Sequence, residues 1–144
     1  MLQVNFYLLS TNSVESRLLT ACRLVDKALQ AGQRVFIQLE NDTDAQACDE
    51  WLWSFKAESF IPHHRLGDGQ FIDAPVLLGL KTPAEADGVL LNLSTRAPQG
   101  LAQFQRVLEV IANDEQLKQA GRSRWQYYRQ QGFRLEKYDL RVRL

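Results

Sequence analysis

The sequence contains few of the residues from which metal, redox and disulfide sites are built. Its 144 residues include two cysteines and two histidines. Cys22 and Cys48 are far apart, lie within helical patterns and belong to no Cys-x-x-Cys or Cys/His ligand spacing, so we expect reduced core thiols. His63 and His64 are adjacent, and adjacent side chains of an extended segment point in opposite directions. The sequence therefore predicts no metal site, no cofactor and no catalytic residue.

Net charge and long apolar runs are also lacking. The chain has 17 basic and 17 acidic residues, which gives no overall field for attracting nucleic acid. No apolar run approaches the ~18 residues that span a bilayer, and the N-terminus lacks signal-peptide features, so we expect a cytoplasmic protein. The charge is uneven, however, because residues 113–144 contain eight basic and four acidic side chains. This basic end would suit a small acidic ligand.

A third feature that the sequence lacks is a glycine-rich phosphate loop. Residues 3–9 and 34–39 read as strands, and between them a helical pattern begins at an Asn12/Glu15 capping box and ends at Gly32. Such a β-α-β unit places its two strands parallel in one sheet. The loop at residues 10–13 contains neither glycine nor lysine, so both common phosphate-binding motifs are missing.

The remaining segments complete an α/β pattern. Residues 42–55 read as a helix with Asn41 or Thr43 as its cap, and residues 75–80 and 88–93 read as buried strands. Pro98 suits a helix start, and apolar residues follow at helical spacing up to Ile111. Residues 133–144 could be an edge strand or a loosely attached tail. We predict one domain over residues 1–144, a three-layer α/β/α fold with an open, mostly parallel, Rossmann-like sheet.

Residues 113–132 have the signals of a helix about five turns long, with an Asn113/Gln116 capping box and Gly132 as its stop. At about 100° per residue, one band roughly 60° wide combines cations with an aromatic ring. Its members are Lys118, Arg122, Trp125 and Arg129. A separate apolar face consists of Leu117, Ala120, Gly121, Tyr127 and Tyr128. The band is either a solvated basic surface or a cradle for an acidic peptide with an apolar anchor.

A second candidate surface lies on the helix at residues 42–55. Its predicted buried face consists of Ala45, Cys48, Trp51, Leu52 and Phe55. Trp53 is about 140° from this face, which would leave its indole exposed. Together with Phe60 and Ile61, it would form an apolar patch suited to docking a partner segment.

Several segments spread over the chain carry a resemblance to a known family. They are FYLL at 6–9, Gln33-Arg34-Val35, Asp49-Glu50-x-Leu52-Trp53, AESFIPH at 57–63, and Leu117-Lys118…Arg122…Tyr128-Arg129…Gly132-Phe133. Together they resemble the chi subunit of bacterial DNA polymerase III holoenzyme, the clamp-loader accessory protein. Chi proteins resemble nucleotide-binding folds without a working phosphate site, which agrees with the glycine-free loop.

This resemblance implies a non-catalytic subunit that bridges two proteins during DNA replication and contacts DNA only indirectly. The psi subunit would bind near Trp53, Phe60 and Ile61. The acidic C-terminal tail of single-stranded DNA-binding protein would bind the basic helix. There, Lys118 and Arg122 would contact the tail's acids or terminal carboxylate, Ile111 and Trp125 would line a pocket for its final Phe, and Arg129 would lie beside them. Other chi proteins have Tyr where this sequence has Trp125.

Three other interpretations of the residues stay open. Trp125, Tyr127 and Tyr128 beside Arg129 could stack the bases of single-stranded DNA directly, although zero net charge disfavours this. A degenerate nucleotide-fold enzyme could use His63 or His64, although the phosphate loop is missing. The chain could also be a purely structural subunit with one interface.

Overall fold

A computed structural model describes residues 2–55, 61–67 and 72–140 of the chain. Its elements are β1 (Gln3–Leu8), α1 (Val14–Gln30), β2 (Val35–Gln38), α2 (Asp42–Ser54), β3 (His63–Arg65), β4 (Val76–Gly79), β5 (Gly88–Asn92), a 3-10 turn (Leu101–Gln103), β6 (Phe104–Ile111), α3 (Glu115–Gln130) and β7 (Arg134–Asp139). The seven strands form one sheet in the order β3-β4-β2-β5-β6-β1-β7, and each pairing in it is parallel. The predicted open parallel α/β fold is confirmed.

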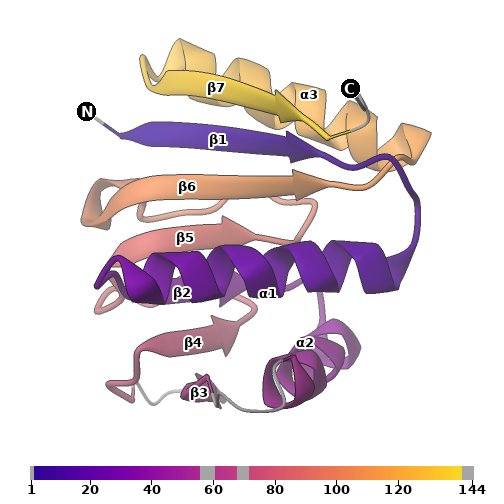
Figure 1. Ribbon diagram of the computed structural model, residues 1–144. Helices are drawn as coiled ribbons and strands as arrows, with labels where there is room; N and C mark the ends of the chain where they lie inside the picture. The colour runs from indigo at the N-terminus through magenta and orange to yellow at the C-terminus, as the bar shows by residue number, and fades with distance from the viewer. Residues whose placement is uncertain (1, 56–60, 68–71, 141–144) are drawn as a thin grey trace.

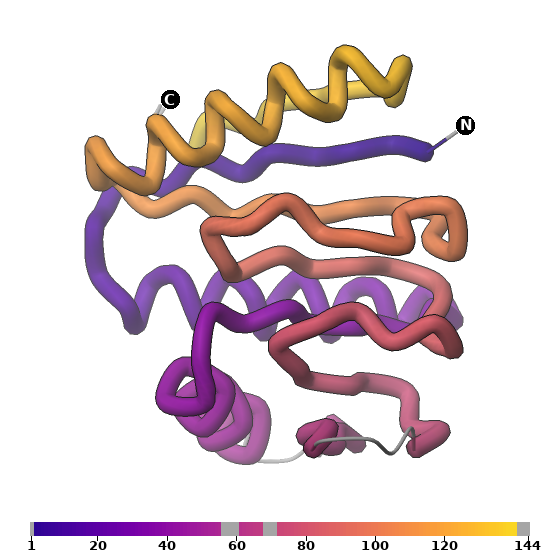
Figure 2. The backbone as a smooth tube through the Cα atoms, turned by 180° about the vertical axis from the view of Figure 1, so that it is seen from behind, coloured from indigo at the N-terminus to yellow at the C-terminus, as the bar shows by residue number. Residues whose placement is uncertain are grey.

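The helices lie on both faces of the sheet. Figure 1 shows α1 in front of the sheet and α3 behind it, and Figure 2 shows the reverse view with α3 nearer the viewer. Successive strand residues point to opposite faces. Ile37 accordingly packs into the core shared with α1 and α2, whereas its neighbour Phe36 packs into the core that contains Tyr128 of α3. The fold therefore has three layers, with one apolar core on each face of the central sheet.

The predicted helix beginning at Pro98 is wrong. Residues 101–103 make one 3-10 turn, and Phe104–Ile111 is strand β6, which pairs with β5 on one side and β1 on the other. The apolar residues match helical spacing, but short apolar runs do not distinguish a helix from a strand buried on both faces. Five consecutive buried residues, 107–111, end this central strand. Because this segment pairs with β5 on one side and β1 on the other, it forms a strand.

Two helix starts also differ from the sequence prediction by one residue. Ser13, not Asn12, caps α1 by accepting a hydrogen bond from the Ser16 amide at 3.1 Å. Asp114, not Asn113, caps α3 through the Leu117 amide at 3.0 Å. Neighbouring Ser, Asn and Asp residues are all good caps, so composition alone does not separate them. Of the two caps considered for α2, Asn41 or Thr43, Asn41 is the correct one.

The segment after α3 is an integral part of the sheet. Gly132 has a φ of +81°, a left-handed conformation that glycine adopts readily and that ends the helix. The chain then returns as β7, which pairs with β1 from Gln3↔Arg134 to Leu8↔Asp139. Of the two alternatives for residues 133–144, the edge strand is therefore correct for 134–139, while residues 141–144 lie outside the described part.

Both cysteines lie deep in the core, with exposed fractions of 1% for Cys22 and 0% for Cys48. Burial raises the pKa of Cys22 to about 11 and raises the pKa of Cys48 as well. Because the thiolate is the reactive form, we expect neither thiol to react with Ellman's reagent at about pH 8 in the native protein. Both should react once guanidinium unfolds the chain. Rapid reaction of the native protein would contradict this placement.

Candidate functional site

Helix α3 packs against the end of the sheet formed by β6, β1 and β7 (Figure 1). Gly121, Arg124 and Tyr128 are its buried residues. A Cβ at Gly121 would lie 3.1 Å from Ile111 Cδ1, so the missing side chain lets the helix approach β6 closely. Tyr127, which was assigned to the apolar face, is 41% exposed instead, and the buried face includes an arginine that sequence reasoning missed.

A buried polar cluster attaches α3 to the sheet. Glu109 of β6 is 0% exposed and accepts hydrogen bonds from Arg124 Nε at 3.0 Å and from the Tyr128 hydroxyl at 2.6 Å. Asn92 Nδ2 donates to the same carboxylate at 3.0 Å. Burial, followed by the Glu109 charge, raises the pKa of Tyr128, so its hydroxyl remains a donor at neutral pH. These contacts hold α3 at a defined height above the sheet.

A cavity of about 450 Å³ lies between α3 and the sheet. Its lining combines an apolar set (Phe6, Leu8, Ile111, Gly121), the Trp125 ring, and three cationic side chains (Lys118, Arg122, Lys137). We refer to this cavity as the α3 pocket. The Trp125 ring meets the Phe6 ring edge-on at 5.1 Å and is only partly buried, so it forms a wall of the pocket. The α3 pocket can take an apolar group against its apolar lining and an anionic group beside its cations.

The cations that line the α3 pocket are available to a ligand. Lys118, whose side chain is 21% exposed, pairs with Glu115 at 3.0 Å, but Glu115 is 82% exposed, so solvent screens the pair and weakens it. This contact lowers the pKa of the Glu115 carboxyl. Arg122 is exposed and makes no ion pair to any residue that the structure describes. An incoming carboxylate would therefore have little internal competition.

The α3 pocket brings together four of the five residues predicted for the acidic tail. Lys118, Arg122 and Trp125 come from α3 and Ile111 comes from β6, whereas Arg129 is exposed and is not among the lining residues. Sequence reasoning missed four lining residues of the site: Phe6, Leu8, Gly121 and Lys137.

The stacking surface considered for single-stranded DNA is not formed as predicted. Tyr128 is 0% exposed and donates its hydroxyl to Glu109, and Trp125 packs against Phe6. Tyr127 is the exposed ring of the three. Because stacking on successive bases needs several open rings, the geometry does not support this interpretation.

The second predicted surface is centred on Trp53, which is 58% exposed and confirms the expected outward indole. Ile61 was predicted on the same patch, but this is wrong. It is 3% exposed and packs in the core with Leu52, because it leads into β3, which packs against α2. Phe60 lies outside the described residues. Trp53 instead meets the His63 ring edge-on at 5.3 Å.

The side chains of His63 and His64 lie on opposite sides of the chain, as expected for neighbours in a strand. His63 has 1% side-chain exposure, with Nε2 at 2.9 Å from Asp49 Oδ1 and Nδ1 at 2.6 Å from the Ile61 carbonyl oxygen. His64 is exposed. Within residues 2–55, 61–67 and 72–140, no cluster of three or more His, Cys, Asp or Glu side chains could hold a metal ion. The contacts of His63 with Asp49, the Ile61 carbonyl and the Trp53 ring are those of a buried structural residue.

Comparison with known proteins identifies the family. Residues 1–136 match the family described as DNA polymerase III chi subunit, HolC. The chain belongs to this family. The chi subunit of Pseudomonas aeruginosa is 35% identical over 141 residues, which cover 97% of this chain and 98% of the relative. The chi subunit of Escherichia coli is 31% identical over 94% of this chain and 96% of the relative, and that of Haemophilus influenzae is 29% identical over 90% and 92%.

As a member of the chi family, the chain is a subunit of DNA polymerase III and takes part in DNA replication. The resemblance inferred from the sequence is thus confirmed. None of the helices within the described residues is both long and apolar enough to span a bilayer. The α3 pocket lies entirely within the part of the chain that matches the family, apart from Lys137, which follows it directly.

Proposed function

We propose that this chi-family chain is a non-catalytic accessory subunit of the clamp loader in the bacterial cytoplasm, where it bridges two protein partners. One partner is the acidic C-terminal tail of single-stranded DNA-binding protein, which binds in the α3 pocket. The other is the psi subunit, which binds around Trp53. The observation that carries the proposal is the combination, in the lining of one cavity, of apolar side chains with three cations.

The α3 pocket matches the chemistry of an acidic tail that ends in an aromatic residue. Lys118 and Arg122 can each form charge-assisted hydrogen bonds with carboxylates. Exposed ion pairs contribute only about 0.2–1 kcal/mol each and weaken in salt. A buried aromatic anchor against Ile111 and Trp125 contributes about 2 kcal/mol or more. Charge alone is therefore a weak attraction, and the aromatic anchor is expected to make the larger contribution to binding.

The surface around Trp53 fits an apolar partner segment. An indole that is 58% exposed on a rigid helix presents a large apolar area, and tryptophan is enriched at the energetic centres of interfaces. The edge contact with His63 fixes one side of the ring. Trp53 lies on α2, next to the β3 edge of the sheet, whereas α3 packs at the β7 edge (Figure 1). The two partners can therefore be bound at the same time.

The proposal is tested with a fluorescent peptide that carries a run of aspartates followed by a terminal phenylalanine. We expect micromolar binding by anisotropy, and roughly 30-fold weaker binding when terminal alanine replaces phenylalanine, because the apolar floor is then unfilled. The alanine peptide is matched in charge and length. Equal affinities for the two peptides would show that charge alone attracts the tail, which would refute the pocket as its site.

A further inference from the structure

Within the described residues, no helix covers the face of β1 and β7 that is turned away from α3. Figure 1 shows α1 in front of β2 and β5, with β1 and β7 above it. Phe6 points to α3, because its ring meets the Trp125 ring at 5.1 Å, so its strand neighbours Asn5 and Tyr7 point to the opposite face. Their register partners on β7 project in the same direction. We refer to this surface as the β1–β7 face.

Two tyrosine rings are stacked on the β1–β7 face. Tyr7 and Tyr138 are register partners, and their ring centroids lie 5.1 Å apart with planes inclined by 14°. Such cross-strand aromatic pairs stabilise a sheet, which accounts for the contact between the rings. Tyr138 is nevertheless 40% exposed, and β7 is the last strand of the sheet. The side of the Tyr138 ring away from Tyr7 is therefore open to a ligand.

A small groove of about 120 Å³ adjoins the other side of Tyr7. Because β1 lies between β6 and β7, Tyr7 has Tyr138 on one side and this groove on the other. Its lining combines the Tyr7 ring with apolar side chains of α1 and β6, such as Leu24 and Leu108, and with two cations. The cations are Lys27 and Arg106. The groove thus offers a flat aromatic wall next to positive charge.

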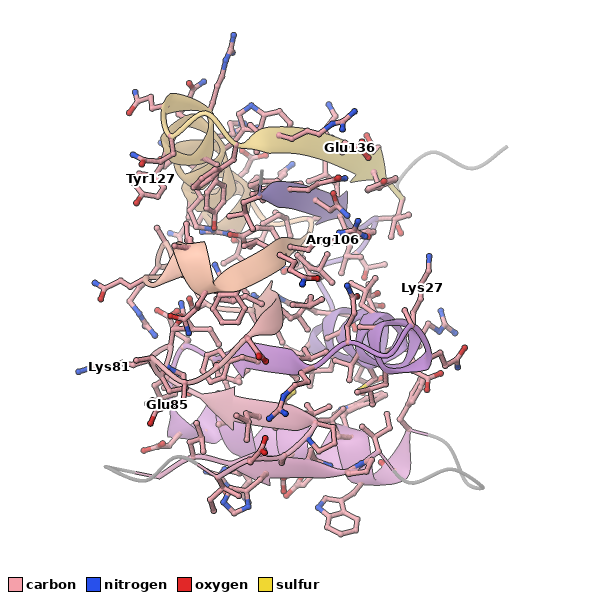
Figure 3. The ribbon with its side chains drawn as sticks, turned by 90° about the vertical axis from the view of Figure 1, so that its left-hand side faces the viewer. Lys27, Lys81, Glu85, Arg106, Tyr127 and Glu136 are labelled. Atoms are coloured by element: carbon pink, nitrogen blue, oxygen red, sulfur yellow. The ribbon has the colours of Figure 1, made fainter. Side chains whose placement is uncertain are left out.

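The β1–β7 face has more positive than negative charge. Arg106 and Arg134 are the register partners of Gln3 on its two sides, so their Cα atoms lie about 10 Å apart. Lys27 of α1 lies with Arg106 on the side of the sheet away from α3 (Figure 3). These three cations are exposed, and none forms an ion pair with a residue that the structure describes. Within strands β6, β1 and β7, Glu136 is the acid on this face.

We propose that the β1–β7 face binds single-stranded DNA directly. One base enters the groove beside Tyr7, another stacks on the open side of Tyr138, and the exposed cations bind phosphates. Exposed aromatic rings on a sheet bind single strands in this manner, because every base has a π face. An acidic peptide would use the cations but not the stacking surface, and a duplex keeps its bases paired. The site is separate from the α3 pocket and adds a direct contact to the indirect one that the family resemblance implies.

The test titrates the full chain into a fluorescent oligonucleotide of about 20 thymidines and measures anisotropy. We expect Tyr138→Ala to weaken binding by at least about fivefold, because one stacked base loses its platform. Tyr138→Phe keeps the ring and should retain the affinity. The matched control is Tyr127→Ala, since Tyr127 is 41% exposed but belongs to α3 on the opposite face, and it should leave binding unchanged (Figure 3). Urea denaturation confirms that each variant is folded.

Salt dependence tests the phosphate contacts. For single strands, each neutralised phosphate contributes about 0.7 to the slope of log affinity against log salt. Three contacts therefore predict about 20-fold weaker binding at ~200 mM than at ~50 mM salt. Arg106→Gln should weaken binding and reduce this change to about sevenfold. Lys81→Gln removes a charge from the other side of the sheet and should leave both values unchanged (Figure 3).

Four results would overturn the inference. The first is no binding of the oligonucleotide by the unsubstituted chain at low salt. The second is equal weakening by Tyr138→Ala and Tyr127→Ala, which would mean that no defined face is used. The third is displacement of the oligonucleotide by the aspartate-phenylalanine peptide, which would place the DNA in the α3 pocket. The fourth is a dimer that Tyr138→Ala abolishes, without DNA binding, which would assign the face to a second copy. Peptide binding is measured separately, so none of these results decides the proposed function.

Discussion

Glu109→Gln is expected to lower the free energy of unfolding by about 3–5 kcal/mol. The carboxylate is 0% exposed and accepts hydrogen bonds from Arg124, Tyr128 and Asn92. Glutamine cannot neutralise the guanidinium of Arg124, which is 6% exposed, and a buried charge without its partner is strongly destabilising. Equilibrium unfolding in guanidinium chloride, compared with the unsubstituted chain, measures the loss.

The matched control is Glu85→Gln, which makes the same chemical change at an exposed loop position (Figure 3). Surface changes of this kind stay within about 0.5 kcal/mol. If Glu109→Gln costs no more than this control, then α3 is held by apolar packing alone. The substitution should also weaken binding of the acidic peptide, because Arg122 lies only two residues before Arg124 on the helix that the cluster positions.

Local patterns predicted much of the fold. This holds for the opening β-α-β unit and for the buried strands near residues 76–79 and 88–92. The lengths of their apolar runs and the turn residues that flank them leave little ambiguity between helix and strand. The segment at 104–111 was misread because its apolar spacing fits a helix equally well. Its structure is set by pairing with β5 and β1, which are distant in sequence. The sequence contained one signal of the buried cluster. Glu109 interrupts an apolar run, and a charged residue that is buried in such a run needs a hydrogen-bonding partner.

The α3 pocket could be predicted only in part, for a related reason. The stripe of Lys118, Arg122 and Trp125 follows from helical periodicity alone. Phe6, Leu8 and Lys137 join it only because β1 and β7 pair side by side under α3, although more than a hundred residues of sequence separate them. Local sequence patterns contain no information about such a pairing. The helical part of the site was therefore predictable from periodicity and Ile111 of β6 from the family resemblance, whereas the parts contributed by β1 and β7 needed the structure.

The two proposed surfaces should be separable by single substitutions. Arg122→Ala removes a guanidinium from the lining of the α3 pocket, and we expect up to about fivefold weaker binding of the acidic tail with unchanged psi binding. Trp53→Ala removes the exposed indole, and we expect about 30-fold weaker psi binding with unchanged tail binding. Calorimetric titration of both purified partners into both variants measures the four affinities.

Neither substitution removes a side chain from the cores, since Arg122 is exposed and Trp53 is 58% exposed. Thermal unfolding should therefore change little, which separates lost contacts from lost structure. Trp53 belongs to α2 and Arg122 to α3, and the two helices pack into different cores on opposite faces of the sheet. Changes at sites that share no contact partner normally add without coupling. Equal losses toward both partners in either variant would mean that the chain has one shared interface instead of two.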